Sequence, residues 1–214
     1  MIWHRSRVGR AAVTAALACL VAACGLFPPD AATQACATPA EGTSLSAPEH
    51  GIELCLPPSW RDLRPGDPGW VVVHGGAGQR VERDVAEGII QRFAVPLAPR
   101  DEDVTVNLAL YVRPIEAGTT LEEVGDQYVD VLEQFDTGEV LREDVALPAG
   151  PAIRLTSART RGEGADALLE RLVVYTLIGA GRSYHLVFVS RETSADAYAP
   201  VFEAIARSVD LSAD

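Results

Sequence analysis

The stretch LVVYTLIGAGRSYHLVFVS, from Leu172 to Ser190, decides the fold because it joins two apolar segments through a short glycine-containing turn. Leu172–Ile178 and Ser183–Ser190 carry apolar residues at both odd and even positions, which predicts two strands with both faces buried. Gly179–Arg182 has the composition of a hairpin turn. We therefore expect this hairpin at the centre of a mainly antiparallel sheet that is covered on both sides.

Two segments with helical periodicity can supply that cover. Thr120 and Glu123 form a capping box at the start of the first, and Gly138 is placed to end it. Its apolar stripe contains Leu121, Val124, Tyr128, Val131, Leu132 and Phe135. The second runs over 198–209, tolerates Pro200 only in its first turn, and buries Val201, Phe202, Ile205 and Val209. The fold class predicted is α+β, a three-layer α/β/α sandwich.

Further strands are indicated by period-two alternation of apolar residues or by short apolar runs between turn residues. Their ranges are 52–56, which ends at Pro57-Pro58, and 70–74, 104–112, 140–147 and 152–157. We expect the last two to be short. The four-residue spacing of Val81, Val85, Ile89 and Phe93 predicts one more helix in spite of Gly88.

The first 23 residues have the order of a secretion signal: a basic start followed by the apolar run Ala11–Ala23. Val21-Ala22-Ala23-Cys24-Gly25 resembles the bacterial lipobox, in which the cysteine becomes diacylglyceryl-modified. The apolar run is shorter than the roughly 20 residues that a transmembrane helix needs. We expect residues 1–23 to be a lipoprotein signal peptide and Cys24 to carry acyl groups such as palmitate. The alternative is an ordinary secretion signal with an incidental cysteine.

The remaining chain divides into two parts by composition. Residues 24–50 follow the lipidated cysteine with Ala, Pro, Thr, Ser and Gly, which is typical of a flexible tether. Residues 51–214 carry the periodic segments and form one globular domain. The protein is then expected on the extracytoplasmic face of the cell membrane, anchored through lipid.

Charge narrows the classes of partner and chemistry. Removal of the signal takes away three of the 18 basic residues and moves the net charge from −12 to about −15, which disfavours nucleic acids and anionic headgroups. All basic residues are Arg, so a Walker A loop, a pyridoxal aldimine and a Ser-x-x-Lys nucleophile are excluded. No cofactor is indicated.

Cys36 and Cys55 are an even pair once Cys19 has left with the signal and Cys24 has taken the lipid. In an oxidising compartment we expect a disulfide between them, which the chain-entropy model values at about 3 kcal/mol for a loop of this size. The alternative is two buried thiols.

The order of elements resembles the LpqN/LpqT type of actinobacterial lipoprotein and, more distantly, the PsbP/DcrB-like domain. The resemblance covers residues 50–212 and is sharpest in Leu56-Pro57-Pro58-Ser59-Trp60, in the strand 184–189 and in the closing helix with Tyr198, Pro200, Phe202 and Ile205. Residues 75–101 depart from it. The resemblance implies an α/β/α sandwich and a binding or assembly role, with no shared catalytic residues.

Catalytic and metal-binding motifs are incomplete. His74-Gly75-Gly76-Ala77-Gly78 is similar to the oxyanion segment of lipases, but no Gly-x-Ser-x-Gly nucleophile elbow accompanies it. His50, His74 and His185 have no second ligand at metal-binding spacing, and the acidic runs 101–103 and 122–123 lack a calcium-loop pattern. We predict no catalytic residues and no metal site.

Trp60 and Trp70 are the only side chains that we single out as candidates for ligand binding, since exposed aromatic rings stack on sugars or line lipid clefts. The competing interpretation makes Trp60 a plug at the sheet edge and places Trp70 in the core. The leading hypothesis is a non-catalytic envelope lipoprotein that binds a protein partner or an envelope lipid. The alternatives are an envelope serine esterase that uses Ser183 with His74 or His185, and an accessory subunit of a membrane assembly.

Overall fold

The computed structural model describes residues 42–64, 67, 90–97, 106–134, 137–162, 164 and 167–212. The helices in this part are α4 (Leu121–Glu133) and α5 (Ala195–Arg207), with 3-10 turns at Pro48–His50 and Glu192–Ser194. The strands are β1 (Thr43–Ala47), β2 (Ile52–Leu56), β3 (Trp60–Asp62), β4 (Arg92–Pro96), β5 (Asn107–Pro114), β6 (Leu141–Leu147), β7 (Gly150–Arg161), β8 (Leu168–Gly179), β9 (Arg182–Arg191) and β10 (Asp210–Leu211).

Seven of these strands form one antiparallel sheet in the order β3-β4-β5-β9-β8-β7-β6. The hairpin β8–β9 turns through Ala180 and Gly181, whose φ angles of 46° and 70° suit the tight turn that antiparallel neighbours require. β9 is the middle strand, which confirms the sequence prediction that this hairpin lies at the centre. β7 is longer than expected, with 12 residues, because it pairs along β8 beyond its apolar part.

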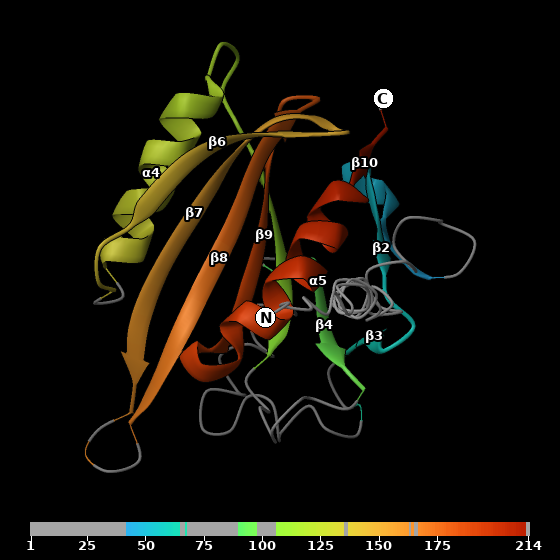
Figure 1. Cartoon of the computed structure of the whole chain (residues 1–214). Helices are drawn as coiled ribbons and strands as arrows, with labels where there is room; N and C mark the ends of the chain where they lie inside the picture. The colour runs from blue at the N-terminus through green and yellow to red at the C-terminus, as the bar shows by residue number, and fades with distance from the viewer. Residues whose placement is uncertain are drawn as a thin grey trace, which may run out of the picture. The chain divides into compact units, whose positions relative to one another are not determined.

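Helices cover both faces of the sheet, as Figure 1 shows, and the predicted three-layer α/β/α arrangement is confirmed. α4 packs on β7 and β8 through a cluster that includes Leu132, Leu155 and Val174. α5 packs on the opposite face, where Phe202 and Ile205 meet Phe188 of β9. β8 and β9 therefore bury side chains in both directions, as their apolar pattern predicts.

α4 begins where the sequence places it. Thr120 accepts a hydrogen bond from the Glu123 amide at 3.2 Å, and the Glu123 carboxylate accepts one from the Thr120 amide at 2.8 Å. This is the predicted capping box. Gly125 faces the sheet, and a Cβ there would stand 2.5 Å from Ile153 Cδ1, so the absence of a side chain lets α4 approach β7.

A second, three-stranded sheet has the order β1-β2-β10 and holds the end of α5. Leu45 and Ala47 of β1 are buried against the main core, and Leu45 pairs with Leu54. The folded part thus begins by Thr43, earlier than the expected boundary at residue 51. The rest of the predicted tether, 24–41, lies outside the described residues.

Two local predictions are corrected by the structure. Phe93 belongs to the strand β4, paired with Ala109 of β5, and not to the helix expected over 81–93, of which 81–89 lies outside the described residues. Pro200 is the sixth residue of α5, beyond the first turn, so the Asp196 carbonyl has no amide partner at that position. The strand expected over 70–74 also lies outside the described residues.

Candidate functional site

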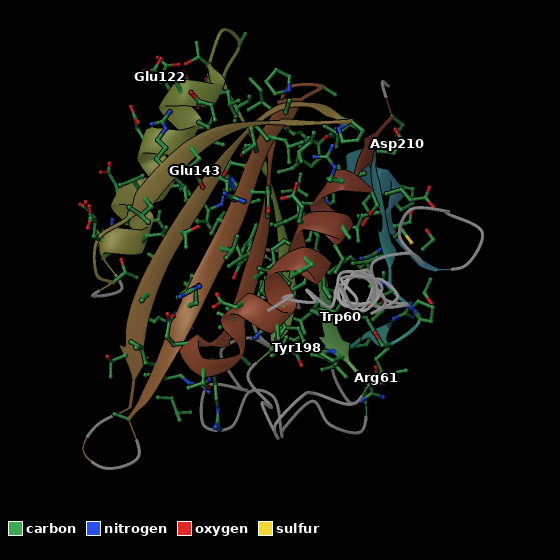
Figure 2. The ribbon with its side chains drawn as sticks, viewed as in Figure 1. Trp60, Arg61, Glu122, Glu143, Tyr198 and Asp210 are labelled. Atoms are coloured by element: carbon green, nitrogen blue, oxygen red, sulfur yellow. The ribbon has the colours of Figure 1, made fainter. Side chains whose placement is uncertain are left out.

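A hollow of about 550 Å³ opens where the small sheet, the β6–β7 turn and the end of α5 meet. We call it the junction pocket. Its lining residues are Ser44, Glu53, Leu54, Cys55, Pro148, Ala149, Arg207, Ser208, Val209 and Asp210. Figure 2 shows Asp210 beside the small sheet, at the rim of this region. Four separate segments of the chain thus converge on one cavity, which is the usual construction of a binding site.

Alternation along β2 explains why polar groups reach the junction pocket. Ile52 and Leu56 face the core, so Glu53 and Cys55 stand on the other side of the strand. Ser208 fixes the end of α5 to this strand, since its hydroxyl accepts from the Cys55 amide at 2.9 Å and donates to the Ile205 carbonyl at 2.7 Å. The pocket wall is therefore held by hydrogen bonds and not by side-chain packing alone.

The charges on the pocket are mixed. Ser44 donates to the Glu53 carboxylate at 2.5 Å, and Asp210 of β10 lies directly opposite Glu53 in the strand register. Like charges at opposed positions destabilise a sheet slightly. Arg207 brings the positive charge, and it pairs with Glu203 at 3.2 Å. This arrangement can recognise polar and charged groups of a ligand.

A serine and a histidine do meet elsewhere, on the face of the sheet under α4. Ser183 Oγ lies 3.1 Å from His185 Nε2, and Thr176 Oγ1 lies 3.1 Å from His185 Nδ1. All three side chains are buried, and Tyr128 of α4 stacks on the imidazole with ring centroids 4.5 Å apart. Burial, assisted by Arg113, lowers the pKa of His185 to about 3.

That pair does not match the needs of a serine hydrolase. A general base works best when its pKa is near the working pH, whereas His185 stays neutral and is a weak base. The group on the second imidazole nitrogen is the Thr176 hydroxyl and not a carboxylate. Ser183 is 3% exposed, which leaves no room for a substrate. The network is a satisfied polar cluster in the core.

The site residues expected from sequence fall in three places. Cys55 lines the junction pocket and is 8% exposed, with Sγ 3.7 Å from the Leu56 carbonyl. Trp60 is 3% exposed and packs edge-to-face on Phe202 at 6.2 Å, so it is the plug of the competing interpretation and offers no surface for a ligand. Cys24, Cys36, Trp70 and His74 lie outside the described residues, and the disulfide stays a prediction.

Sequence reasoning missed the residues that shape the junction pocket. Ser208 and Asp210 follow a helix whose end we could place only approximately, and Ala149 is in a turn that the sequence marks simply as a turn. The alternation of Glu53 with Leu54 did predict that Glu53 faces away from the core. What lies opposite it depends on contacts between distant segments, for which the sequence has no local signal.

In the described part of the chain, no group of three or more His, Cys, Asp or Glu side chains could hold a metal ion. Likewise, none of its helices is long and apolar enough to cross a membrane.

No protein-family model matches the chain, and no curated protein matches it either. Several solved structures are similar in fold. The solution structure of CyanoP, a cyanobacterial PsbP from Synechocystis, has a TM-score of 0.50 and 16% identity over 79% of this chain and 92% of its own. The Saccharomyces cerevisiae Ran-binding protein Mog1p has a TM-score of 0.51 and 11% identity over 79% and 95%.

LpqN of Mycobacterium tuberculosis, described as involved in cell envelope biogenesis, aligns with a TM-score of 0.48 and 11% identity over 80% of this chain and 86% of its own. Identities this low show a fold and no more. The chain therefore has the PsbP/Mog1-like α+β fold, and the PsbP-like part of the sequence resemblance is confirmed. The LpqN type remains a prediction.

Proposed function

We propose that the chain is a cell-envelope lipoprotein of the LpqN type, anchored through Cys24, whose domain binds a protein partner and catalyses no reaction. The observation that carries this is the junction pocket, a cavity of about 550 Å³ built from four segments whose walls mix apolar, polar and charged side chains. Such a surface suits recognition of a protein segment, because Leu54, Ala149 and Val209 offer apolar contacts beside its polar and charged groups. No group of three or more His, Cys, Asp or Glu side chains in the described residues could hold a metal ion.

The proposed lipid anchor and the junction pocket are separated by only a short stretch of sequence. β1 starts at Thr43, about 20 residues after Cys24, and its Ser44 lines the pocket. A flexible chain of that length spans roughly 25 Å. A lipid on Cys24 would keep the pocket close to the membrane surface, so the partner we propose is itself membrane-associated.

A protein partner is favoured over a lipid cargo by the packing of the core. The rings of Phe188 and Phe202 stack at 4.6 Å, and Tyr198 stacks on Phe202 at 5.9 Å. An acyl chain would need an apolar cavity, whereas the aromatic cluster under α5 is filled by its own side chains. That Mog1p, a protein of this fold, is a Ran-binding protein is in keeping with this proposal.

Site-specific crosslinking in intact cells tests the partner. We would replace Ala149, in the pocket wall, with a photoreactive amino acid, and place the same group at Glu122 on the exposed side of α4 as a matched control. We expect one stoichiometric protein adduct from position 149 and none from position 122. The partner, once purified, should bind the full chain and lose affinity at least tenfold for Ala149→Arg. Identical adducts from both positions would refute a specific site.

Mass spectrometry of the protein isolated from membranes tests the anchor and the disulfide. We expect acyl groups on Cys24 that disappear in Cys24→Ser, together with release of the variant from the membrane. The same digest should contain a peptide joining Cys36 to Cys55 that separates on reduction. A fluorophosphonate probe should leave Ser183 unlabelled, and labelling of that residue would instead support the esterase alternative.

A further inference from the structure

A second, smaller hollow lies along the flank of α5, on the face of β7 and β8 that is turned toward the viewer in Figures 1 and 2. We call it the flank groove. Its volume is about 130 Å³, and its lining residues are Arg154, Thr156, Arg171, Val173, Tyr175, Ser190, Ala195, Ala199 and Phe202. The volume accommodates a few atoms of a ligand, such as the end of one side chain.

Strand register sets which groups meet in the flank groove. Arg171 of β8 stands directly opposite Ser190 of β9, so the guanidinium and the hydroxyl lie on the same face of the sheet. Thr156 of β7 is opposite Val173, one step along that face. On the helix side the wall is made by Ala195 and Ala199, whose short side chains leave the space open.

Ser190 contributes to the groove a buried hydroxyl that no neighbouring residue of the described chain satisfies. Its side chain is 1% exposed, and its hydroxyl has no hydrogen-bond partner among the described residues. Leaving a buried hydroxyl without a partner is unfavourable, so such groups normally meet a protein atom, a water or a ligand. The hydroxyl lines a cavity and can donate to an oxygen placed there.

The two arginines of the groove are held in position by carboxylates. Arg171 donates through Nε to Glu192 and through Nη1 to Asp196, each at 3.0 Å, and through Nη2 to Glu192 as well, and these bonds raise the pKa of the guanidinium. Arg154 donates to Glu143 through Nε at 2.8 Å and through Nη2 at 2.5 Å. A guanidinium has five N–H donors, so Arg171 keeps two N–H groups, one on each Nη, beyond these bonds. The groove thus offers donors, and its ligand must supply acceptors.

We propose that the flank groove binds one carboxylate that the protein partner presents, on an acidic side chain or at a chain end. This rests on the proposed function, since it names the chemical group by which the same partner is recognised at a second point on α5. Arg171 and Ser190 contact the two carboxylate oxygens, and the methylene groups behind them lie on Val173 and Phe202. Four carboxylates, of Glu143, Glu192, Asp196 and Glu203, already pair with the two arginines. Their negative charge repels a singly charged carboxylate less than a doubly charged phosphate, so the carboxylate fits better.

The groove can be tested without the partner, by NMR titration of the isotopically labelled full chain with sodium propionate at constant ionic strength. We expect saturable shifts of the Arg171 and Ser190 amide signals at millimolar concentrations, and at least fivefold weaker binding of inorganic phosphate. Arg171→Gln should weaken propionate binding at least tenfold. Ser190→Ala, which preserves the ion pairs, should weaken it at least threefold.

Ser157→Ala is the matched control, because Ser157 is also buried with a hydroxyl that has no partner in the described chain, but it does not line the groove. That variant should bind propionate like the wild type. Absence of saturable shifts, tighter binding of phosphate, or an equal loss in Ser157→Ala would overturn the proposal.

The source of the carboxylate is tested in cells with the photoreactive group at position 199. If the partner presents it, position 199 should give the same adduct as position 149, and propionate should reduce the former more than the latter. An adduct at 149 alone would leave the proposed function standing and overturn the partner as the source. Propionate binding with no adduct at either position would instead contradict the proposed function while the groove itself is retained.

Discussion

The two faces of the central sheet differ in where their polar side chains lie and in how they are hydrogen-bonded. Under α4, the His185 ring hydrogen-bonds both Ser183 and Thr176, and Tyr128 stacks on it from the helix. On the other face an aromatic core lies under α5, and the polar groups stand at the edge of the helix, where the flank groove remains open. A chemically suggestive pair can therefore be structural, while the groups that we propose to bind a ligand lie where packing is incomplete.

The cause of the difference is the position of each helix. α4 packs over β7 and β8, and its Tyr128 reaches His185 of β9. α5 packs on β9 and β2, so the same side of β7 is left with the polar residues Arg154 and Thr156 beside the helix. Incomplete cover on this face leaves room for a partner, and complete cover on the other leaves room for none.

The largest expected effect follows from removing the centre of the α5 face. Phe202→Ala should lower the free energy of unfolding by about 3–5 kcal/mol, because its ring contacts Trp60, Phe188 and Tyr198 and leaves a cavity among them. Urea denaturation of the full chain measures this. Leu132→Ala, on the α4 face, should cost less, at the lower end of about 2–5 kcal/mol. Equal losses would mean that the α5 face and the α4 face contribute equally to stability.

The second prediction concerns the sealed imidazole. The pKa of His185 is lowered to about 3 in the folded protein, so the unfolded chain binds its proton more readily. The stabilisation is therefore complete above the ordinary pKa of about 6.5 and is lost as pH falls toward the folded value. Between pH 7 and pH 4, wild type should lose about 3 kcal/mol more stability than His185→Gln.

His50→Gln is the control for that measurement, since His50 is outside the buried cluster and its Nε2 lies 2.6 Å from the Gln91 side chain. Parallel pH profiles for wild type and His185→Gln would show that the imidazole is open to water, and would reopen the question of chemistry at Ser183.

A smaller effect on stability is expected at the start of α4, the helix whose Tyr128 covers His185. Thr120→Ala removes the capping box of α4 and should lower the free energy of unfolding by about 1 kcal/mol. Hydrogen exchange should quicken in the first turn of α4 while the amides of β9 keep their protection. Thr119→Ala alters the same kind of residue next to the cap and should have little effect. Faster exchange in β9 would mean that the cover of His185 by α4 depends on the first turn of this helix.

Apolar periodicity was sufficient for five strands of the main sheet, β5 to β9, and for both helices. β2, β8, β9 and α4 follow their patterns because local sequence and tertiary burial agree there. Phe93 was placed in a helix because apolar residues four apart also occur in strands, and only pairing with β5 decides between them. β1 alternates as Ser44-Leu45-Ser46-Ala47, but it is short and its burial comes entirely from distant partners.

The two hollows differ in how far sequence could have located them. Arg171 and Ser190 are equally distant from the hairpin turn, so a two-residue turn at Ala180-Gly181 implies that they face each other. Whether that pair lines a groove depends on where α5 packs, and the register of a hairpin does not predict this. The junction pocket needs the docking of β10 and of the β6–β7 turn, and neither has a local signal.

The smallest predicted effect separates the two faces most directly, because each has one buried serine hydroxyl without a partner among the described residues. Ser157 lies in the closed face, so Ser157→Ala removes an unpaired polar group and should raise the free energy of unfolding by up to about 1 kcal/mol. Ser190 lines the flank groove, and we predict that a water in the groove pairs with its hydroxyl. Ser190→Ala should therefore change stability by less than about 0.5 kcal/mol.

If both variants stabilise the chain equally, Ser190 is as dry as Ser157 and the groove is closed to ligands. If only Ser157→Ala does so, the difference is the free energy that water in the groove provides, which a bound carboxylate would have to exceed.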